Sequence, residues 1–196
     1  MFKGEIDMNE LKIYSVSDKY ISFLQKYVSG VYSNKEGARS HTRKYLGAVY
    51  CIDGYNYYIP LSSPKNSDYQ ILKGKKVIRR SIIPIMRIVE KLSDETLELK
   101  GTLRISHMIP VPSSELILYD LDNETDLPYK NLVQKEVIFI RKNKGKIVKN
   151  AKLMYKQKIT NDTTANYIRT ALDYKLLESK CDEFSKNDNI LNHEKC

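Results

Sequence analysis

The chain has no tryptophan, few cysteines and histidines, and none of the residue patterns that mark a bound cofactor. Its 8 glycines are scattered singly, so there is no GxGxxG and no Walker loop to hold a nucleotide phosphate. The three histidines, His41, His107 and His193, have no partners at ligand spacing. We therefore expect no metal site and no organic cofactor.

The sequence also lacks a disulfide framework and a long apolar run. Cys51, Cys181 and Cys196 are far apart and form no CxxC pair, which favours a reducing cytoplasm. Mean hydropathy is −0.49, no apolar run approaches the roughly 18 residues of a membrane span, and residues 1–10 are too polar for a signal peptide. The simplest organisation is one domain over residues 1–196.

Positive charge is abundant and unevenly placed. The formal net charge is +9, and residues 141–158 contain eight basic residues but no Asp or Glu. A second basic cluster lies within residues 73–80. Concentrated positive charge favours a polyanionic partner such as nucleic acid, and the alternative is a solvated lysine face.

The first third of the chain predicts a strand, a helix and a hairpin. Residues 11–16 alternate apolar and polar, as in a strand. Ser17 then offers an N-cap for a helix whose apolar spacing continues to Val28. Residues 45–52 and 55–61 indicate two strands joined by an Asp-Gly pair, a strong hairpin signal.

Further strand candidates occupy the middle of the chain. Residues 77–89 are apolar and β-branched, with Pro84 marking an edge strand, a bulge or a strand start. Residues 97–105 predict another strand and residues 107–112 an extended segment. Residues 115–121 fit either a strand or a short turn.

The C-terminal third is predicted to be helical. Residues 129–159 keep one apolar periodicity, with Gly145 as a weak point, and residues 161–163 offer N-caps for a last helix reaching Leu177. From about residue 185 a polar, frayed tail is expected. The order of elements predicts an α+β fold: an antiparallel sheet or small barrel with an early helix and C-terminal helices.

The most informative segment is residues 57–66, which read YYIPLSSPKN. An aromatic strand stops at a rigid turn, because Pro64 has no N–H and restricts its predecessor to extended geometry. Ser62, Ser63 and Lys65 thus place two hydroxyls and one ammonium at the lip of a sheet. This combination suits a phosphate group.

Phosphate chemistry without a metal is available to such a site if the substrate is RNA. The 2′-OH beside each phosphate is a built-in nucleophile, so a protein needs only to align it and to stabilise charge on the phosphoryl oxygens. The products would carry a 2′,3′-cyclic phosphate and a 5′-OH.

Three blocks of the sequence resemble the type III toxin–antitoxin endoribonucleases, the ToxN/AbiQ/CptN family. They are residues 12–21 (KIYSVSDKYI), residues 45–65, which include the PLSSPK motif, and residues 105–111 (ISHMIPV). The resemblance covers most of the chain. It implies a compact, highly twisted antiparallel β-barrel related to the Kid/MazF toxins, with inserted and C-terminal helices.

The resemblance also implies a partner and a biological role. Members of this family cleave RNA without metal and are inhibited by an antitoxin RNA, a repeat transcript that the toxin processes into pseudoknots. Protein and RNA then form closed complexes, which can act in phage abortive infection, and the substrate is cellular or phage mRNA. Residues 141–158 supply the basic surface that such RNA binding requires.

Carried over position by position, the resemblance assigns a candidate site. Ser63 and Lys65 match the essential hydroxyl and lysine of the family motif, and Ser62 stands where many relatives have Thr. Tyr20 matches the tyrosine that closes the first block, and Arg43 a basic residue before the second. The alternatives are a turn-stabilising hydroxyl for Ser63, a solvated charge for Lys65 and a core position for Tyr20.

Other residues are expected to contact RNA. Lys44 could substitute for its neighbour Arg43, and Tyr69 could stack on a base where Ser67 replaces the aromatic residue of many relatives. The expected contacts are Lys44, Tyr69, Lys142, Lys144, Lys146, Lys149, Lys152 and Lys156. Residues 1–7 precede the family's usual start, so Met8 is the expected initiator.

Two other functions stay open on the sequence alone. One is a non-catalytic RNA-binding module that uses the same basic surface, although a pure binder has no need of the Ser-Ser-Pro-Lys turn. The other is a MazF-like ribonuclease controlled by a protein antitoxin. A tandem-repeat array beside the gene would favour the RNA antitoxin, and a small acidic reading frame the protein.

Overall fold

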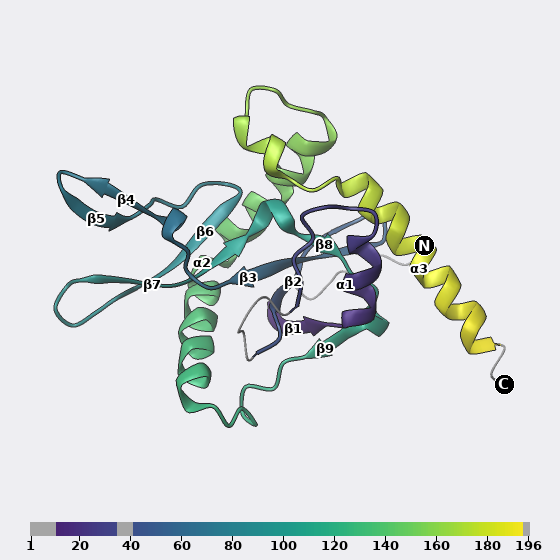
Figure 1. Ribbon diagram of the computed structural model, residues 1–196, viewed down its shortest axis with the longest axis horizontal. Helices are drawn as coiled ribbons and strands as arrows, with labels where there is room; N and C mark the ends of the chain where they lie inside the picture. The colour runs from purple at the N-terminus through teal and green to yellow at the C-terminus, as the bar shows by residue number, and fades with distance from the viewer. Residues whose placement is uncertain (1–10, 35–40, 194–196) are drawn as a thin grey trace.

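The computed structural model describes residues 11–34 and 41–193, with side chains described up to residue 187 (Figure 1). The expected initiator Met8 and residues 194–196 lie outside these ranges. Within them the fold is α+β, as predicted: one antiparallel sheet, a separate two-stranded hairpin and three α-helices. No described helix is long and apolar enough to cross a membrane.

The main sheet has seven strands, and every pairing in it is antiparallel. Six of them follow the order β6-β7-β3-β2-β1-β9, and β8 pairs with β3. The strands are β1 (Lys12–Val16), β2 (Lys44–Ile52), β3 (Tyr55–Ser62), β6 (Ile85–Lys91), β7 (Leu97–Arg104), β8 (Ile109–Pro110) and β9 (Leu116–Leu118). Among the described strands, none joins β6 to β9, so a closed barrel is not found.

The hairpin of β2 and β3 is confirmed together with its turn. Tyr50 pairs with Tyr57, and Asp53 and Gly54 have φ values of 49° and 86°. Positive φ at both central residues is what a type I′ turn requires, and Asp-Gly tolerates it. This hairpin brings the PLSSPK motif to the end of β3.

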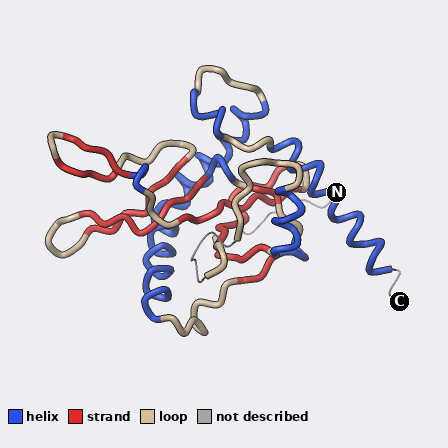
Figure 2. The backbone as a smooth tube through the Cα atoms, in the orientation of Figure 1, coloured by secondary structure: helices blue, strands red, loops and turns tan. Residues whose placement is uncertain are grey.

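The apolar run of residues 77–89 is divided at Pro84, and a strand start, one of the three alternatives for this proline, is what the structure shows. The first part of the run belongs to β5 (Lys75–Ile78), which pairs with β4 (Tyr69–Leu72), and its second part is β6. A turn around Pro84 separates them, because proline cannot donate to a ladder. The β4–β5 hairpin, unpredicted, extends from the main sheet on the same side of the view as β6 and β7 (Figure 2).

The first helix begins where the sequence indicates, and the second begins two residues earlier than predicted. Helix α1 (Asp18–Gln25) is capped by Ser17, whose Oγ accepts from the Tyr20 amide at 3.1 Å, but it ends three residues before Val28. Helix α2 (Leu127–Ile159) is capped by Asp126 and passes through Gly145 without interruption.

The last helix begins later than expected. Asp162 accepts from the Thr164 amide at 3.1 Å, but this closes a turn, and residues 166–170 form only a 3₁₀ helix. Helix α3 (Tyr174–His193) follows, so residues 185–193 continue a helix where an irregular tail was expected.

The core lies between the sheet and the three helices. Helix α2 packs against β2, β6 and β7, whereas α3 packs against α1 and β8. Both Tyr57 and Tyr58 are buried. Tyr57 and Tyr155 donate to the same Glu178 oxygen at 2.8 and 2.7 Å, so these tyrosines are structural.

Candidate functional site

The Ser-Ser-Pro-Lys turn leaves the sheet at the end of β3 and is fixed by a buried acid. Ser62 pairs with Thr102 of β7, after which Ser63 and Lys65 are exposed. The Lys65 amide donates to Asp68 Oδ2 at 3.0 Å, and the Asp68 amide donates to the Lys65 carbonyl at 2.9 Å. One hydroxyl and one ammonium therefore face solvent from a loop whose backbone is held at both ends.

Arg43 holds the other hydroxyl of the motif. The residue is 2% exposed, and its Nη1 donates to Ser62 Oγ and to the Leu61 carbonyl, each at 2.9 Å. Nε donates to the Ser33 carbonyl at 2.9 Å. Because Ser62 Oγ accepts from Arg43, its own O–H is directed away from the guanidinium. The structure thus joins Arg43 to the motif as a positioning residue.

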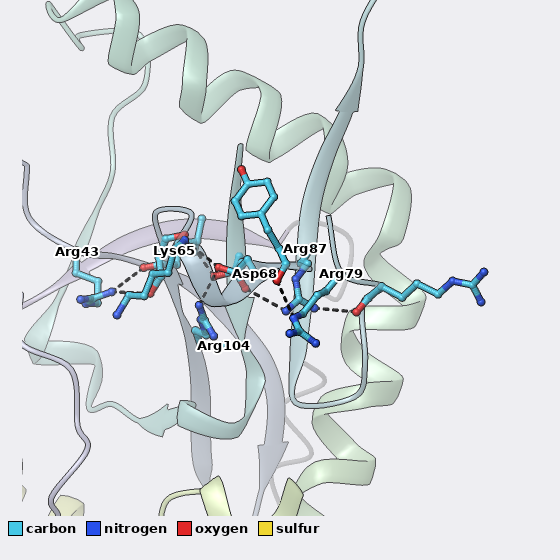
Figure 3. Close-up of polar contacts among 11 residues, drawn as sticks. Arg43, Lys65, Asp68, Arg79, Arg87 and Arg104 are labelled. Atoms are coloured by element: carbon cyan, nitrogen blue, oxygen red, sulfur yellow. Dashed lines mark hydrogen bonds and ion pairs between the residues drawn. The ribbon is translucent and has the colours of Figure 1, made fainter. Parts of the chain in front are cut away.

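Asp68 lies at the centre of a group of cations (Figure 3). It is completely buried, Oδ1 contacts Arg87 Nη2 at 3.1 Å, and Oδ2 contacts Arg104 Nη2 at 3.3 Å. The guanidinium of Arg87 also donates to the Arg80 carbonyl at 2.8 Å. One carboxylate therefore ties β6 and β7 to the backbone of Lys65.

Tyr32 and His107 complete this group, and sequence reasoning missed both. The His107 ring stacks on Tyr32 with centroids 4.6 Å apart. The Arg43 guanidinium lies 4.7 Å and the Lys65 Nζ 5.9 Å from the Tyr32 centroid. Burial and the charges of Arg104, Arg43 and Lys65 lower the pKa of His107 to about 4, so its imidazole is neutral at pH 7.

Weak sequence signals existed for two of the missed residues. His107 falls inside the ISHMIPV block, and Asp68 follows Lys65 by three residues, the spacing of a side chain that caps a backbone amide. Tyr32, Arg87 and Arg104 had none, because tertiary packing alone brings them to the turn.

A cavity of about 320 Å³ opens beside the turn, between the sheet and the N-terminal part of α2. Ser62 and Ser63 line it together with Lys100 of β7. Tyr129 and Glu136 line it from α2. Burial raises the pKa of Glu136 to about 7. The exposed Ser63 hydroxyl therefore lies in the same cavity as an aromatic residue, Tyr129, and an acidic residue, Glu136.

Tyr20, the fifth predicted catalytic residue, does not join the group. It is completely buried, its hydroxyl donates to the Pro110 carbonyl at 2.7 Å, and its ring packs edge-on against Phe184. Burial raises the pKa of the phenol far above its ordinary value. The core position, the alternative for this tyrosine, is what the structure shows, because helix α1 turns this face inward.

The two other predicted RNA contacts near the turn are partly engaged within the protein. Lys44 Nζ donates to Ser15 Oγ at 3.2 Å and lies 4.2 Å from the Tyr119 centroid, and burial lowers its pKa. Tyr69 is half-buried directly after Asp68, with Lys76 Nζ 4.4 Å from its ring centroid. Contact of either residue with RNA stays a prediction.

The basic stretch lies on the second half of α2. Lys142, Lys146, Lys149 and Lys156 recur at spacings of four, three and seven residues, so they share one side of the helix. Of the predicted RNA-binding lysines on α2, these four and Lys152 are exposed, and Lys144 is half-buried. We refer to Lys142, Lys146, Lys149, Lys152 and Lys156 as the α2 basic stripe.

The donors near the turn are hydroxyls, cations and one neutral imidazole. In the described part of the chain, no group of three or more His, Cys, Asp or Glu side chains is arranged to hold a metal ion. The arrangement can bind a phosphodiester, donate hydrogen bonds to its oxygens and accept a proton.

Comparison with known proteins finds one family and several solved structures. The family described as "Toxin ToxN, type III toxin-antitoxin system" matches residues 12–182. The endoribonuclease AbiQ of Lactococcus lactis subsp. lactis is 34% identical over 187 residues, which cover 94% of this chain and 95% of AbiQ.

Two solved structures share the fold over nearly their whole length. A structure of AbiQ, described as a lactococcal anti-phage endoribonuclease of the type III toxin–antitoxin system, superposes with a TM-score of 0.71 and 27% identity. It covers 91% of this chain and 99% of its own. A structure concerned with selective toxin inhibition by a non-coding RNA pseudoknot gives a TM-score of 0.72, 26% identity and coverages of 90% and 99%.

Proposed function

The chain belongs to the ToxN family of type III toxin–antitoxin toxins, and we propose that it is a metal-independent endoribonuclease held inactive by an antitoxin RNA. The observation that carries the proposal is the fixed turn of Ser63 and Lys65 beside a cation cluster. A non-catalytic RNA-binding module would not need an exposed hydroxyl and ammonium on a loop braced by a buried carboxylate.

The proposed reaction is attack of the 2′-oxygen on the adjacent phosphorus. Lys65 and Ser63 stabilise the negative charge that develops on the phosphoryl oxygens, and Ser62, oriented by Arg43, donates a further hydrogen bond. The P–O5′ bond breaks as the new P–O2′ bond forms. The 2′-OH gives up its proton, and the leaving 5′-oxygen takes one up, which yields a 2′,3′-cyclic phosphate and a 5′-OH.

His107 is the proposed proton acceptor for the 2′-OH. Nδ1 of His107 lies 2.9 Å from Ser106 Oγ, and in the tautomer in which Nδ1–H donates to Ser106 the other nitrogen, Nε2, is the acceptor. Burial and the nearby cations, which lower the pKa of His107, keep the imidazole neutral at pH 7. Stacking on Tyr32 fixes the plane of the ring next to Arg43 and Lys65. Tyr20 takes no part, because its hydroxyl is buried in the core.

The α2 basic stripe is the proposed contact surface for the antitoxin RNA. A neighbour of similar fold is inhibited by an RNA pseudoknot, and by analogy we propose a repeat-derived pseudoknot and a closed protein–RNA complex here. Substrates would be cellular or phage mRNA in the cytoplasm, and anti-phage defence is the corresponding role. Descent of this open sheet from a Kid/MazF-like barrel also stays a prediction.

Cleavage of a pool of random-sequence RNA in excess EDTA tests the proposed chemistry. We expect cleavage to persist, with a 2′,3′-cyclic phosphate on one product and a 5′-OH on the other. Tight RNA binding without cleavage would favour the binding module instead. Cleavage that EDTA abolishes would contradict the metal-independent mechanism.

Removing charge from the α2 basic stripe is expected to weaken RNA binding and its salt dependence. With Lys142 and Lys149 both changed to Gln, the slope of log K against log salt should fall by about 2, because each lost phosphate contact lowers it by about 1. The binding of a synthetic RNA pseudoknot would be measured over a range of salt concentrations. Every protein would also carry Ser63→Ala, which is expected to slow cleavage of the RNA during the measurement by about 10²–10³.

A matched control removes the same charge elsewhere. Lys26 and Lys186 are exposed and lie outside α2, so changing both to Gln should leave the slope close to that of the parent protein. Equal effects of the two double substitutions would show that net charge matters and that the stripe is not the contact surface.

A further inference from the structure

The cavity beside Ser62 and Ser63 has one wall that the proposed cleavage chemistry does not use. Glu136 contributes to this wall and is the only acidic residue of α2, a helix of 33 residues with an otherwise basic sequence. It is 7% exposed, so it does not serve the solvated face of the helix. A carboxyl group in this position calls for an explanation.

A glycine lets this carboxyl approach the strand backbone. A Cβ atom built on Gly101 of β7 would lie 2.6 Å from Glu136 Oε1 and 3.3 Å from the Ser62 carbonyl oxygen. The carboxyl therefore occupies the space beside Gly101, immediately behind the peptide of Ser62. This places it next to the residues that are proposed to hold the phosphate.

The Glu136 carboxyl has unused hydrogen-bonding capacity. No hydrogen bond or charge of a neighbouring residue contributes to the pKa shift of this carboxyl, and burial alone raises its pKa to about 7. A neutral carboxyl offers one donor and one acceptor side by side, whereas a carboxylate offers acceptors only. The titratable or charged residues that line the cavity with it are His41, Arg43, Lys44, Lys100 and Tyr129.

The cavity also has the size and the surfaces of a site for a flat ring. Its volume of about 320 Å³ lies at the lower end of the roughly 300–1,000 Å³ of small-molecule sites. His41 and Tyr129 line it and stack on each other with centroids 3.7 Å apart, so each ring covers one face of the other. Leu61 and Leu132 add apolar walls. Aromatic faces of this kind stack on unpaired bases.

We infer that the cavity binds a nucleobase next to the cleaved phosphodiester and that Glu136 reads the hydrogen-bonding edge of that base. The inference rests on the proposed function for its substrate. Adenine and cytosine present a ring nitrogen that only accepts, so pairing through that nitrogen needs the O–H of Glu136. Guanine and uracil present a ring N–H that a carboxylate can accept.

The inference predicts how affinity changes with pH. Four 2′-deoxynucleoside 3′-methyl phosphates serve as probes, because they lack the attacking hydroxyl and keep one charge between pH 6 and 8. For the wild-type protein, affinity for the adenine and cytosine probes should fall about tenfold between pH 6 and pH 8, as Glu136 loses its proton. Affinity for the guanine and uracil probes should not fall.

Variants assign the effect to Glu136. Glu136→Gln keeps a donor and an acceptor at every pH, so the adenine and cytosine probes should bind it without the tenfold fall. Glu95→Gln removes an exposed acid from the turn between β6 and β7 and should behave as wild type. Absence of binding, a pH response common to all four probes, or the same fall in Glu136→Gln would overturn the inference.

These probes separate the inference from the proposed function, since binding them needs no cleavage. If the protein binds the probes as expected but does not cleave random RNA, the base site is supported and the proposed ribonuclease activity is contradicted. If RNA is cleaved, the base preference beside the cut should shift towards guanine or uracil between pH 6 and 8 in wild type but not in Glu136→Gln. If the cleavage preference did not change with pH in either protein, the base site would be contradicted and the proposed ribonuclease activity would not.

Discussion

The Ser63→Ala protein is expected to cleave RNA about 10²–10³ times more slowly than wild type, with its fold intact. This is the typical cost of removing one preorganised donor from a site that stabilises developing negative charge. Ser63 is exposed and lies outside the core, so the free energy of unfolding should change by less than about 0.5 kcal/mol. Single-turnover cleavage of a defined RNA oligonucleotide, together with thermal unfolding, gives both quantities.

The chain offers a close control four residues away. Ser67 is an exposed serine of the same loop, and Ser67→Ala should cleave at close to the wild-type rate. Equal rates for Ser63→Ala and wild type would remove Ser63 from the mechanism. A large effect of Ser67→Ala would instead show that the loop tolerates no change.

The largest effect on stability is expected at Asp68. Asp68→Ala leaves Arg87 and Arg104 buried without their shared carboxylate and the Lys65 amide without its acceptor. Removing one partner of a buried ion pair costs about 3–5 kcal/mol, because an uncompensated buried charge stays behind. Urea denaturation would show this as a lower midpoint, and cleavage should also fall because the Lys65 loop is no longer held.

An exposed aspartate provides the comparison. Asp94 accepts only from Thr96 in its own turn, so Asp94→Ala should cost less than about 1 kcal/mol. If Asp68→Ala unfolded at the same urea concentration as wild type, the buried carboxylate would not be what fixes the turn. If the Asp68→Ala protein cleaved RNA at the wild-type rate, activity would not depend on how Asp68 holds the Lys65 loop.

Local patterns were sufficient for most of the secondary structure. The Asp-Gly hairpin, the Ser17 cap and the long helix α2 each depend on neighbouring residues, and all three are confirmed. The errors occurred where tertiary packing overrides local preference. The turn at Asp162 closes on itself before any helix begins, so the last helix starts later than predicted.

The candidate site divides in the same way. The Ser-Ser-Pro-Lys motif and the basic charge of residues 141–158 are local features, so the sequence by itself was sufficient for the family and for an RNA partner. A phosphate bound at the turn stays a prediction. Tyr20 and Arg43 were found by the same resemblance, but the sequence could not tell a buried phenol from a side chain at the site. The helical spacing of Tyr20 does not show whether its side of α1 faces the core or the site.

Only the tertiary structure decided which groups surround that turn. Arg87 and Arg104 come from β6 and β7, and His107 from the segment that follows, so long-range strand pairing brings them to Asp68 and Lys65. Glu136 reaches the site because Gly101 leaves room for its carboxyl. Burial and neighbouring charge then determine which groups are ionised, and these depend on contacts between residues far apart in the sequence.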